Sequence, residues 1–194
     1  MGFMDIIQAQ LTEARDVLDE FMGDPGNLED IGSAARIMIE AAGNGKKIIA
    51  CGNGGSMTDA MHFAEELSGV FREKRRALPA MAISDPSHIT CAANDYGFEA
   101  IFSRFVEAVG QAGDVLVAIS TSGNSLNIIR AVEAAHEKGM KVVGLTGRSG
   151  GLLAGMADCE IRVRGRQHSD RIQEMHIKVL HILVLLVENA TSRS

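Results

Sequence analysis

One stretch of the sequence decides the fold: residues 114–130 read Asp-Val-Leu-Val-Ala-Ile-Ser-Thr-Ser-Gly-Asn-Ser-Leu-Asn-Ile-Ile-Arg. The apolar run from Val115 to Ile119 predicts a buried strand, and a helix is predicted to begin shortly after it. Between them lie Gly123 and four hydroxyl side chains: Ser120, Thr121, Ser122 and Ser125. Free backbone N–H groups at a helix start, joined by short hydroxyls, can bind an anion without a nearby cation. Four hydroxyls within six residues favour this interpretation over an ordinary N-cap serine in a loop.

The sequence around this stretch alternates between short apolar strands and helices. Strands are predicted over residues 47–51, 78–84, 115–120, 142–146 and 159–163, with helices over 56–67, 87–93, 98–109, 126–138 and 169–189. Two more helices precede them, separated by a break at residues 24–27, and the second is predicted over residues 28–42. The pattern predicts an α/β fold: a three-layer αβα sandwich with a five-stranded parallel sheet, preceded by N-terminal helices.

The composition excludes several classes of protein. The formal net charge is -6 and tryptophan is absent, which argues against a basic nucleic-acid-binding face and against base-stacking platforms. The chain shows no apparent signal peptide, and its longest apolar run near the C-terminus, residues 182–187, is too short to span a membrane. Three cysteines without CxxC spacing fit a reducing compartment. We therefore expect a cytoplasmic protein with no nucleic-acid or membrane partner.

Two polar segments besides residues 120–125 are predicted at the carboxyl edge of the sheet, where open α/β sheets bind ligands. One is the turn Gly52-Asn53-Gly54-Gly55-Ser56, and the other is Asn94-Asp95, after the second predicted strand and a short helix. The glycine turn has neither the G-x-G-x-x-G spacing nor a following Gly-Lys-Ser/Thr, so no nucleotide cofactor is predicted. Its glycines allow the backbone to approach a ligand, and Ser56 lies at a helix entrance.

The helix after the glycine turn carries an imidazole and a carboxylate on one face. His62 and Glu66 are four residues apart, whereas Glu65 points elsewhere on the helix. This spacing suits a shared metal ion or an acid/base pair, and the alternative is a surface ion pair.

The C-terminal helix is apolar around most of its circumference, which predicts burial against its own sheet and against partner subunits. It also carries Gln173 and His181, which are eight residues apart or about 12 Å along the axis. One small ion shared by both would require extended side chains or contributions from two chains. A histidine on such a helix can also be a hydrogen-bonded core residue.

Seven segments together resemble the phosphoheptose isomerases of the sugar isomerase (SIS) family. They are Cys-Gly-Asn-Gly-Gly-Ser (51–56), Asp-Ala-Met-His-Phe-Ala-Glu-Glu-Leu (59–67), Ala-Ile-Ser-Asp (82–85), Asn94-Asp95, Ile-Ser-Thr-Ser-Gly-Asn-Ser (119–125), Leu-Thr-Gly (145–147) and Asp-Arg-Ile-Gln-Glu-Met-His-Ile-Lys-Val-Leu-His (170–181). The resemblance covers almost the whole chain. It implies a flavodoxin-like SIS fold and a single SIS domain over residues 1–194, in which residues 1–45 form a helical extension used in oligomer packing and 46–194 the α/β core. Met57 stands where relatives often have His or Cys.

The resemblance also implies the roles of individual residues. The sugar phosphate would be bound by Ser120, Thr121, Ser122 and Ser125, and the sugar lined by Asn53, Gly54, Gly55, Ser56, Glu66, Asn94, Asp95 and Gln173. One Zn²⁺ per subunit would be held by His62, Glu66, Gln173 and His181. The catalytic pair would be Glu66, as the proton shuttle, and His181, for ring opening or protonation of oxygen.

The implied reaction converts sedoheptulose 7-phosphate to D-glycero-D-manno-heptose 7-phosphate through an enediol(ate), within a homotetramer. It is the first step toward nucleotide-activated heptose for lipopolysaccharide core or other surface glycans. Two alternatives belong to the same family: a non-catalytic SIS tetramer that binds the replication initiator protein, and another SIS sugar-phosphate isomerase. Glu66 and His181 argue against the first, because the scaffold relatives lack these acid/base residues.

Overall fold

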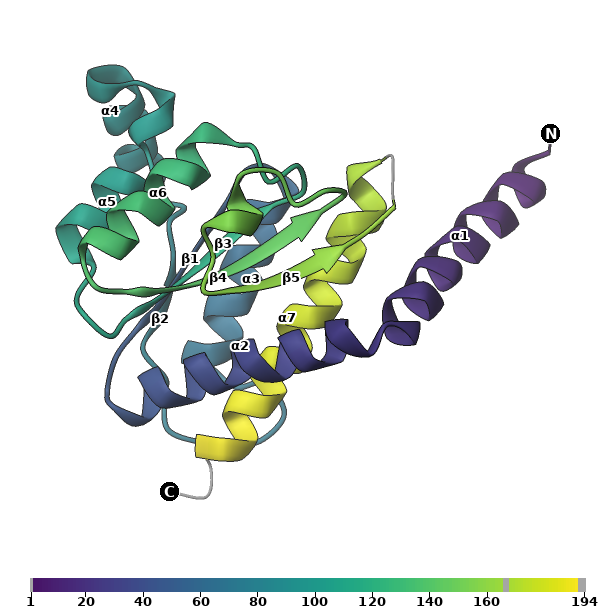
Figure 1. The fold of residues 1–194 in the computed structure, drawn as a ribbon, viewed down its shortest axis with the longest axis horizontal. Coiled ribbons are helices and arrows are strands. Elements are labelled where there is room, and N and C mark those ends of the chain that lie inside the picture. The colour runs from purple at the N-terminus through teal and green to yellow at the C-terminus, as the bar shows by residue number, and fades with distance from the viewer. Residues whose placement is uncertain (1, 166–167, 192–194) are drawn as a thin grey trace.

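A five-stranded parallel sheet organises the protein, seen here in a computed structural model that describes residues 2–165 and 168–191 (Figure 1). The strands lie in the order β2-β1-β3-β4-β5. Their bounds are β1 Ile48–Gly52, β2 Ala80–Ala82, β3 Val115–Ser120, β4 Lys141–Gly147 and β5 Cys159–Val163. The helices are α1 Phe3–Gly23, α2 Pro25–Gly43, α3 Gly55–Ser68, α4 Pro86–Tyr96, α5 Ser103–Val109, α6 Leu126–Glu137 and α7 Ser169–Thr191, with short 3₁₀ turns η1 Phe98–Ala100 and η2 Leu153–Gly155. The predicted α/β sandwich is confirmed.

The central strands β1 and β3 are buried along their whole length because helices cover both faces of the sheet. All five residues of β1 and all six of β3 are buried, and they pair in register from Ile48 with Val115 to Gly52 with Ile119. On one face, residues such as Ile48 and Val117 pack against α2, α3 and α7; on the other, residues such as Leu116 pack against α5 and α6. The sheet therefore fixes where the loops at its carboxyl edge lie.

The second strand is shorter than predicted. The expectation was residues 78–84, but β2 contains only Ala80–Ala82. At its start, Leu78 N–H donates to Leu67 O rather than to the sheet, and Pro79 has no N–H to donate. At its end, Asp85 caps α4 by accepting from His88 N–H, so the chain turns away from the sheet.

Two predicted helix boundaries are also corrected. The break at residues 24–27 is confined to Asp24, because Pro25 is compatible with the first helical position and the Asp24 carboxylate accepts from Gly26 N–H. The single helix expected over residues 98–109 is divided into η1 and α5, because the N–H groups of Ala100 and Ile101 bond three residues back rather than four.

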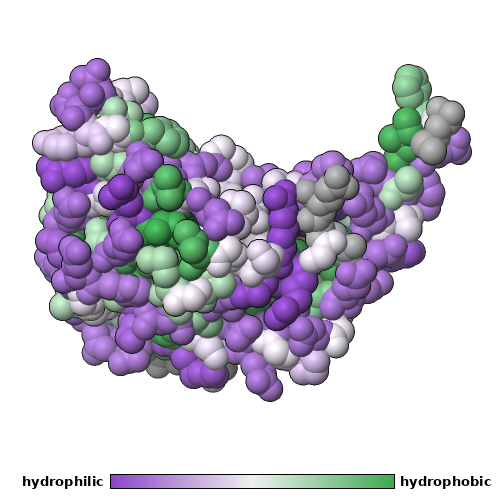
Figure 2. All heavy atoms as spheres, turned by 45° about the horizontal axis from the view of Figure 1, so that its top comes forward, coloured by the Kyte–Doolittle hydropathy of each residue, from purple (hydrophilic) through white to green (hydrophobic). Residues whose placement is uncertain are grey.

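Helix α1 projects beyond the body of the protein (Figure 1). Val17 and Phe21 attach it to the core, and Arg171 on α7 adds two hydrogen bonds, from Nη2 to Gln10 Oε1 at 2.5 Å and from Nε to Glu13 Oε2 at 3.3 Å. Hydrophobic side chains gather at its free end (Figure 2), where Phe3 is 87% and Met4 74% exposed. Among the helices formed by described residues, none is long and apolar enough to cross a membrane.

Candidate active site

The hydroxyl turn after β3 forms a cradle at the carboxyl edge of the sheet, as predicted. Ser120 Oγ lies 3.2 Å from Ser125 Oγ and accepts a hydrogen bond from Gly123 N–H, also at 3.2 Å. Ser122 Oγ accepts from Asn124 N–H at 3.2 Å. Ser125 occupies the N-cap position of α6, yet its side chain makes no capping bond to that helix in the described structure. The ordinary N-cap alternative therefore does not account for Ser125, and N–H groups of the first turn of α6 stay available to an anion.

The turn after β4 supports this cradle through a close backbone approach. Gly123 has a φ of +67°, and a Cβ placed on it would lie 1.8 Å from the carbonyl oxygen of Gly150. Leu153 N–H donates to Gly123 O at 3.0 Å, and Leu152 N–H donates to Asn124 Oδ1 at 3.1 Å. The chain needs glycine here because any side chain would separate the two turns.

The glycine turn after β1 lies beside the cradle and is joined to it by two asparagines. Asn53 Nδ2 donates to Asn127 Oδ1 at 3.0 Å, and Asn127 Nδ2 donates to Asn53 Oδ1 at 2.8 Å. Asn127 is in the first turn of α6, two residues after Ser125, and is 3% exposed. Ser56, at the start of α3, is also buried. Two separate loops are thereby held as one surface.

A triad of two imidazoles and one carboxylate comes from two helices. His62 and Glu66 on α3 meet His181 on α7, and one donor atom from each lies within 4.8 Å of the others. His62 Nε2 is 3.2 Å from Glu66 Oε1, and the His62 and His181 rings are 5.0 Å apart. The ring of Phe71 stacks on that of His181, with the two centroids 5.7 Å apart. The predicted shared face of His62 and Glu66 is confirmed, and the addition of His181 goes beyond a surface ion pair.

The donor set of the triad fits a zinc ion. Imidazole nitrogen and carboxylate oxygen are both common Zn²⁺ ligands, and three protein ligands with an open position are typical of a catalytic site. Glu66 is mostly buried, with 16% of its side chain exposed, whereas 44% of the His62 side chain is exposed. Glu65 lies farther from His62 Nε2, at 3.8 Å, and its side chain is largely exposed, which agrees with the predicted direction.

Gln173, the fourth predicted ligand, lies on α7 two turns before His181. Its side chain packs against Gly55, where an added Cβ would come within 2.8 Å of Gln173 Nε2. Gly55 therefore makes room for Gln173 at the start of α3. The place of Gln173 among the metal ligands stays a prediction, as does its contact with the sugar.

The position predicted for Asn94 and Asp95 is corrected. They do not follow a short helix but lie within the last turn of α4, because that helix continues to Tyr96 and ends at Gly97, whose φ is +90°. Both are exposed, and Asn94 Nδ2 donates to Asp95 Oδ1 at 2.7 Å. Figure 1 shows α4 well apart from α7, so a single chain does not bring these two residues to the triad. Their contact with the sugar stays a prediction.

Sequence reasoning left three well-placed residues without a role. Asn127 is one, and Arg75, whose buried side chain donates to the backbone carbonyl of Glu66, is another. The third is Asp59, one turn before His62, whose Oδ2 is buried with no hydrogen-bond partner among the described residues. Burial raises the pKa of Asp59 to about 6, with His62 acting in the opposite direction. The helical spacing of Asp59 and His62 was the signal that could have identified it.

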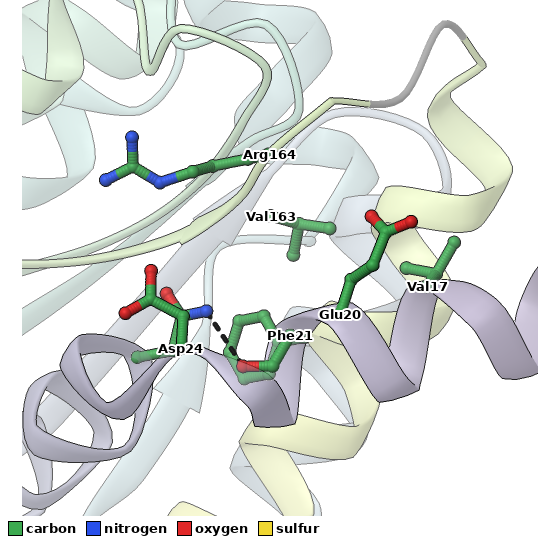
Figure 3. Close-up of a pocket in the computed structure, with 7 residues that line it drawn as sticks. Val17, Glu20, Phe21, Asp24, Val163 and Arg164 are labelled. Atoms are coloured by element: carbon green, nitrogen blue, oxygen red, sulfur yellow. Dashed lines mark hydrogen bonds between the residues drawn. The ribbon is translucent and has the colours of Figure 1, made fainter.

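A separate pocket lies where the α1–α2 junction meets the end of β5 (Figure 3). Val17, Phe21 and Val163 line it together with the charged side chains of Glu20, Asp24 and Arg164. Asn27 Nδ2 on α2 donates to Phe21 O near the end of α1 at 2.9 Å, which links the two helices at their junction. None of the predicted site residues lines this pocket.

The fold, the hydroxyl cradle and the triad define a SIS domain, a class of α/β domain. A family model described as SIS domain matches residues 11–147.

The chain belongs, within that class, to the phosphoheptose isomerase family. It is 55% identical to the phosphoheptose isomerase of Aeromonas hydrophila over 98% of this chain and 100% of the relative, and 58% identical to that of Proteus mirabilis over 96% and 97%. Among solved structures, phosphoheptose isomerases from Neisseria gonorrhoeae and Francisella tularensis superpose with TM-scores of 0.90 and 0.91, at 42% and 38% identity. Both cover 97% of this chain and 100% of the solved chain.

Proposed function

We propose that this protein is an aldose–ketose isomerase that converts sedoheptulose 7-phosphate to D-glycero-D-manno-heptose 7-phosphate. The observation that carries the proposal is the meeting of Glu66 and His181, from two different helices, within the triad. A carboxylate and an imidazole held this close can move protons at neighbouring atoms of one substrate. Relatives bearing the name phosphoheptose isomerase over nearly their full length support the choice of substrate.

The cradle is proposed to bind the phosphate of the substrate. The hydroxyls of Ser120, Thr121, Ser122 and Ser125 and the N–H groups at the start of α6 would donate hydrogen bonds to the phosphate oxygens. Binding through neutral donors suits a chain with a formal net charge of -6. The phosphate anchor positions the sugar and takes no part in proton transfer.

The reaction is proposed to proceed by proton transfer between C1 and C2 of the open-chain ketose. Glu66 removes a proton from C1, and the electron pair forms the C1–C2 double bond while the C2 carbonyl oxygen becomes an enediol(ate) oxygen. Return of the proton to C2 and loss of the O1 proton leave an aldehyde at C1. His181 gives and takes the protons on oxygen, including those of ring opening.

The proposed metal ligands are His62, Glu66 and His181, with Gln173 as the fourth. A Zn²⁺ ion held there would supply Lewis-acid polarisation of the carbonyl and hydroxyl oxygens of the substrate. The sugar is proposed to be lined by Asn53, Gly54, Gly55 and Ser56, and by Asn94 and Asp95. Since Asn94 and Asp95 are remote from the triad within one chain, their participation would require the α4 of a partner subunit.

Assembly, domain organisation and location are proposed as follows. Residues 1–194 form one SIS domain, whose extension, residues 1–45, packs against other subunits in a homotetramer. Exposed apolar side chains on α1, including Phe3 and Leu11, support such packing. A cytoplasmic location is supported by the three cysteines, all free thiols. The product would enter nucleotide-activated heptose synthesis for lipopolysaccharide core or other surface glycans.

The test is a turnover assay with a panel of ketose phosphates of five, six and seven carbons, each with added Zn²⁺. The expected result is formation of a seven-carbon aldose phosphate from sedoheptulose 7-phosphate, with little turnover of the shorter sugars. If only a pentose phosphate were turned over, the protein would instead be another SIS sugar-phosphate isomerase. Turnover of none of them would reject an isomerase role and favour a binding function.

A further inference from the structure

The loop between α3 and β2 is tied to α7 by a buried ion pair. Arg75 Nε lies 3.3 Å from Glu188 Oε2, and the two side chains are only 1% and 2% exposed. Glu188 Oε1 also accepts from the backbone N–H groups of Arg72 and Glu73, each at 3.3 Å. We refer to Arg75 and Glu188 as the clamp.

The other end of the Arg75 guanidinium holds the last turn of α3. Nη2 donates to the carbonyl oxygen of Glu66 at 2.7 Å, and Nη1 donates to that of Leu67 at 2.8 Å. Carbonyls in the last turn of a helix have no intrahelical partner, and a cation there is favourable. A single guanidinium thus contacts the peptide of Glu66 itself and, through Glu188, helix α7.

The clamp spans the two helices that build the triad. Glu188 is seven residues after His181 on α7, which is about two turns. The loop that carries Arg75 also carries Phe71, whose ring stacks on His181. One short loop therefore contacts the backbone of Glu66, the ring of His181 and the buried carboxylate two turns beyond it.

A buried ion pair contributes little to the stability of the folded protein, because desolvation offsets most of the attraction between the charges. Its effect on geometry is stronger, since the planar guanidinium holds two carbonyls of α3 through Nη1 and Nη2 while its charge stays 3.3 Å from the Glu188 carboxylate. We infer that the clamp positions the triad: Arg75 and Glu188 set how Glu66 on α3 stands relative to His181 on α7. The inference rests on the proposed function, and neither residue touches substrate.

Two conservative variants test the clamp. Glu188→Gln keeps an oxygen for the N–H groups of Arg72 and Glu73 but removes the ion pair. Arg75→Lys keeps the charge but cannot reach both Glu188 and the Glu66 carbonyl. In each, we expect kcat to fall and Zn²⁺ affinity to weaken by about 10- to 100-fold, as for other residues that orient metal ligands. KM for the sugar phosphate should stay near the wild-type value, because the cradle is untouched.

The matched control is a second buried ion pair, remote from the triad. Lys47 Nζ lies 2.5 Å from Asp114 Oδ2, with the Asp114 side chain 1% exposed, at the amino ends of β1 and β3. Asp114→Asn should lower the melting temperature as much as the clamp variants do. It should leave kcat and Zn²⁺ affinity unchanged, which separates positioning from general loss of stability.

Zn²⁺ affinity is measured with zinc chloride against a chromophoric chelator, and folding is checked by circular dichroism. Wild-type kcat and Zn²⁺ affinity in both folded clamp variants would overturn the inference, as would equal losses in Asp114→Asn. If Arg75→Lys does not fold, the isosteric Glu188→Gln decides. The titration uses the metal alone, so it tests the clamp even if the protein turns over no sugar phosphate.

Discussion

The side-chain amides of Asn53 and Asn127 exchange two hydrogen bonds, at 3.0 and 2.8 Å, between the turn after β1 and the first turn of α6. The pair satisfies one donor and the acceptor of each amide. Asn127 is nearly fully buried, so its rotamer is fixed by packing as well as by Asn53. The glycine turn proposed to line the sugar is therefore held at a set position relative to the cradle proposed to bind the phosphate.

Asn127→Ala is expected to raise KM and to destabilise the protein. It leaves the amide of Asn53 without its partner, at a cost of about 1–3 kcal/mol. The glycine turn then loses its fixed position, and KM should rise by about tenfold for each 1.4 kcal/mol of binding energy lost. Steady-state kinetics and urea denaturation measure the two effects. Asn127→Asp loses the donor to Asn53 Oδ1 and buries a carboxylate, so it should be at least as damaging, and wild-type KM and stability in both variants would contradict the role of the amide pair.

Gly123→Ala is expected to disrupt the cradle. The added methyl group would collide with Gly150 O, and the φ of +67° is unfavourable for alanine, so both the turn and its support must move. Affinity for inorganic phosphate, measured by calorimetry, should fall together with stability. Gly43→Ala is the control, because a Cβ there meets nothing within 4 Å at the end of α2. The role of the close approach would be wrong if both variants bound phosphate like the wild type.

Glu66→Gln and His181→Ala are expected to lower kcat by about 10²- to 10⁴-fold, the usual contribution of a positioned acid or base. Both variants should fold, because Glu66 and His181 are only partly buried and do not belong to the hydrophobic core. Exchange of the C1 or C2 hydrogen with solvent deuterium, followed by NMR, separates the roles. Glu66→Gln should abolish exchange. Persistent exchange in that variant would assign the carbon proton to another base.

Stability is expected to fall in acid through His176. This histidine of α7 is fully buried, Nε2 donates to Thr146 O at 2.9 Å, and burial lowers its pKa to about 4 from 6.5. The unfolded chain therefore binds a proton at a higher pH than the folded protein does. The contribution of His176 to the free energy of unfolding is fully present above pH 6.5. About 3 kcal/mol of it is lost as the pH falls toward 4.

Urea denaturation at a series of pH values checks this expectation. His176→Gln retains a donor for Thr146 O but cannot titrate, so its free energy of unfolding should change less between pH 6.5 and 4. Parallel pH profiles for the two proteins would show that His176 is not the titrating group.

The sequence alone was enough to predict those elements and contacts that depend on a single local pattern of residues. The apolar runs predicted β1 and β3 to within one residue at each end, because strands buried on both faces are almost continuously apolar. The same holds for His62 and Glu66, whose contact follows from helical periodicity alone.

Long-range partners were beyond local patterns. The pairing of Asn53 with Asn127 spans 74 residues, and that of Arg75 with Glu188 also joins distant segments, so neither could be seen before the helices were placed. Asn94 and Asp95 were misplaced because the length of α4 is set jointly by its cap at Asp85 and its end at Gly97, 12 residues apart in the chain. The packing of Gln173 against Gly55 was likewise beyond local patterns, because it joins α7 to the start of α3.

The strand order has a consequence for the chain as it is synthesised. β1 makes its longer pairing with β3, from Ile48 with Val115 to Gly52 with Ile119, whereas β2 offers it only three residues. A nascent chain must therefore extend well past its midpoint before the apolar strand β1 can be enclosed on both sides. Until then one edge of β1 stays unpaired, and an open apolar edge of this kind aggregates or recruits chaperones. Truncation before β3 should thus yield insoluble fragments, and release of residues 115–120 from the ribosome should be the point at which the central sheet first becomes protected.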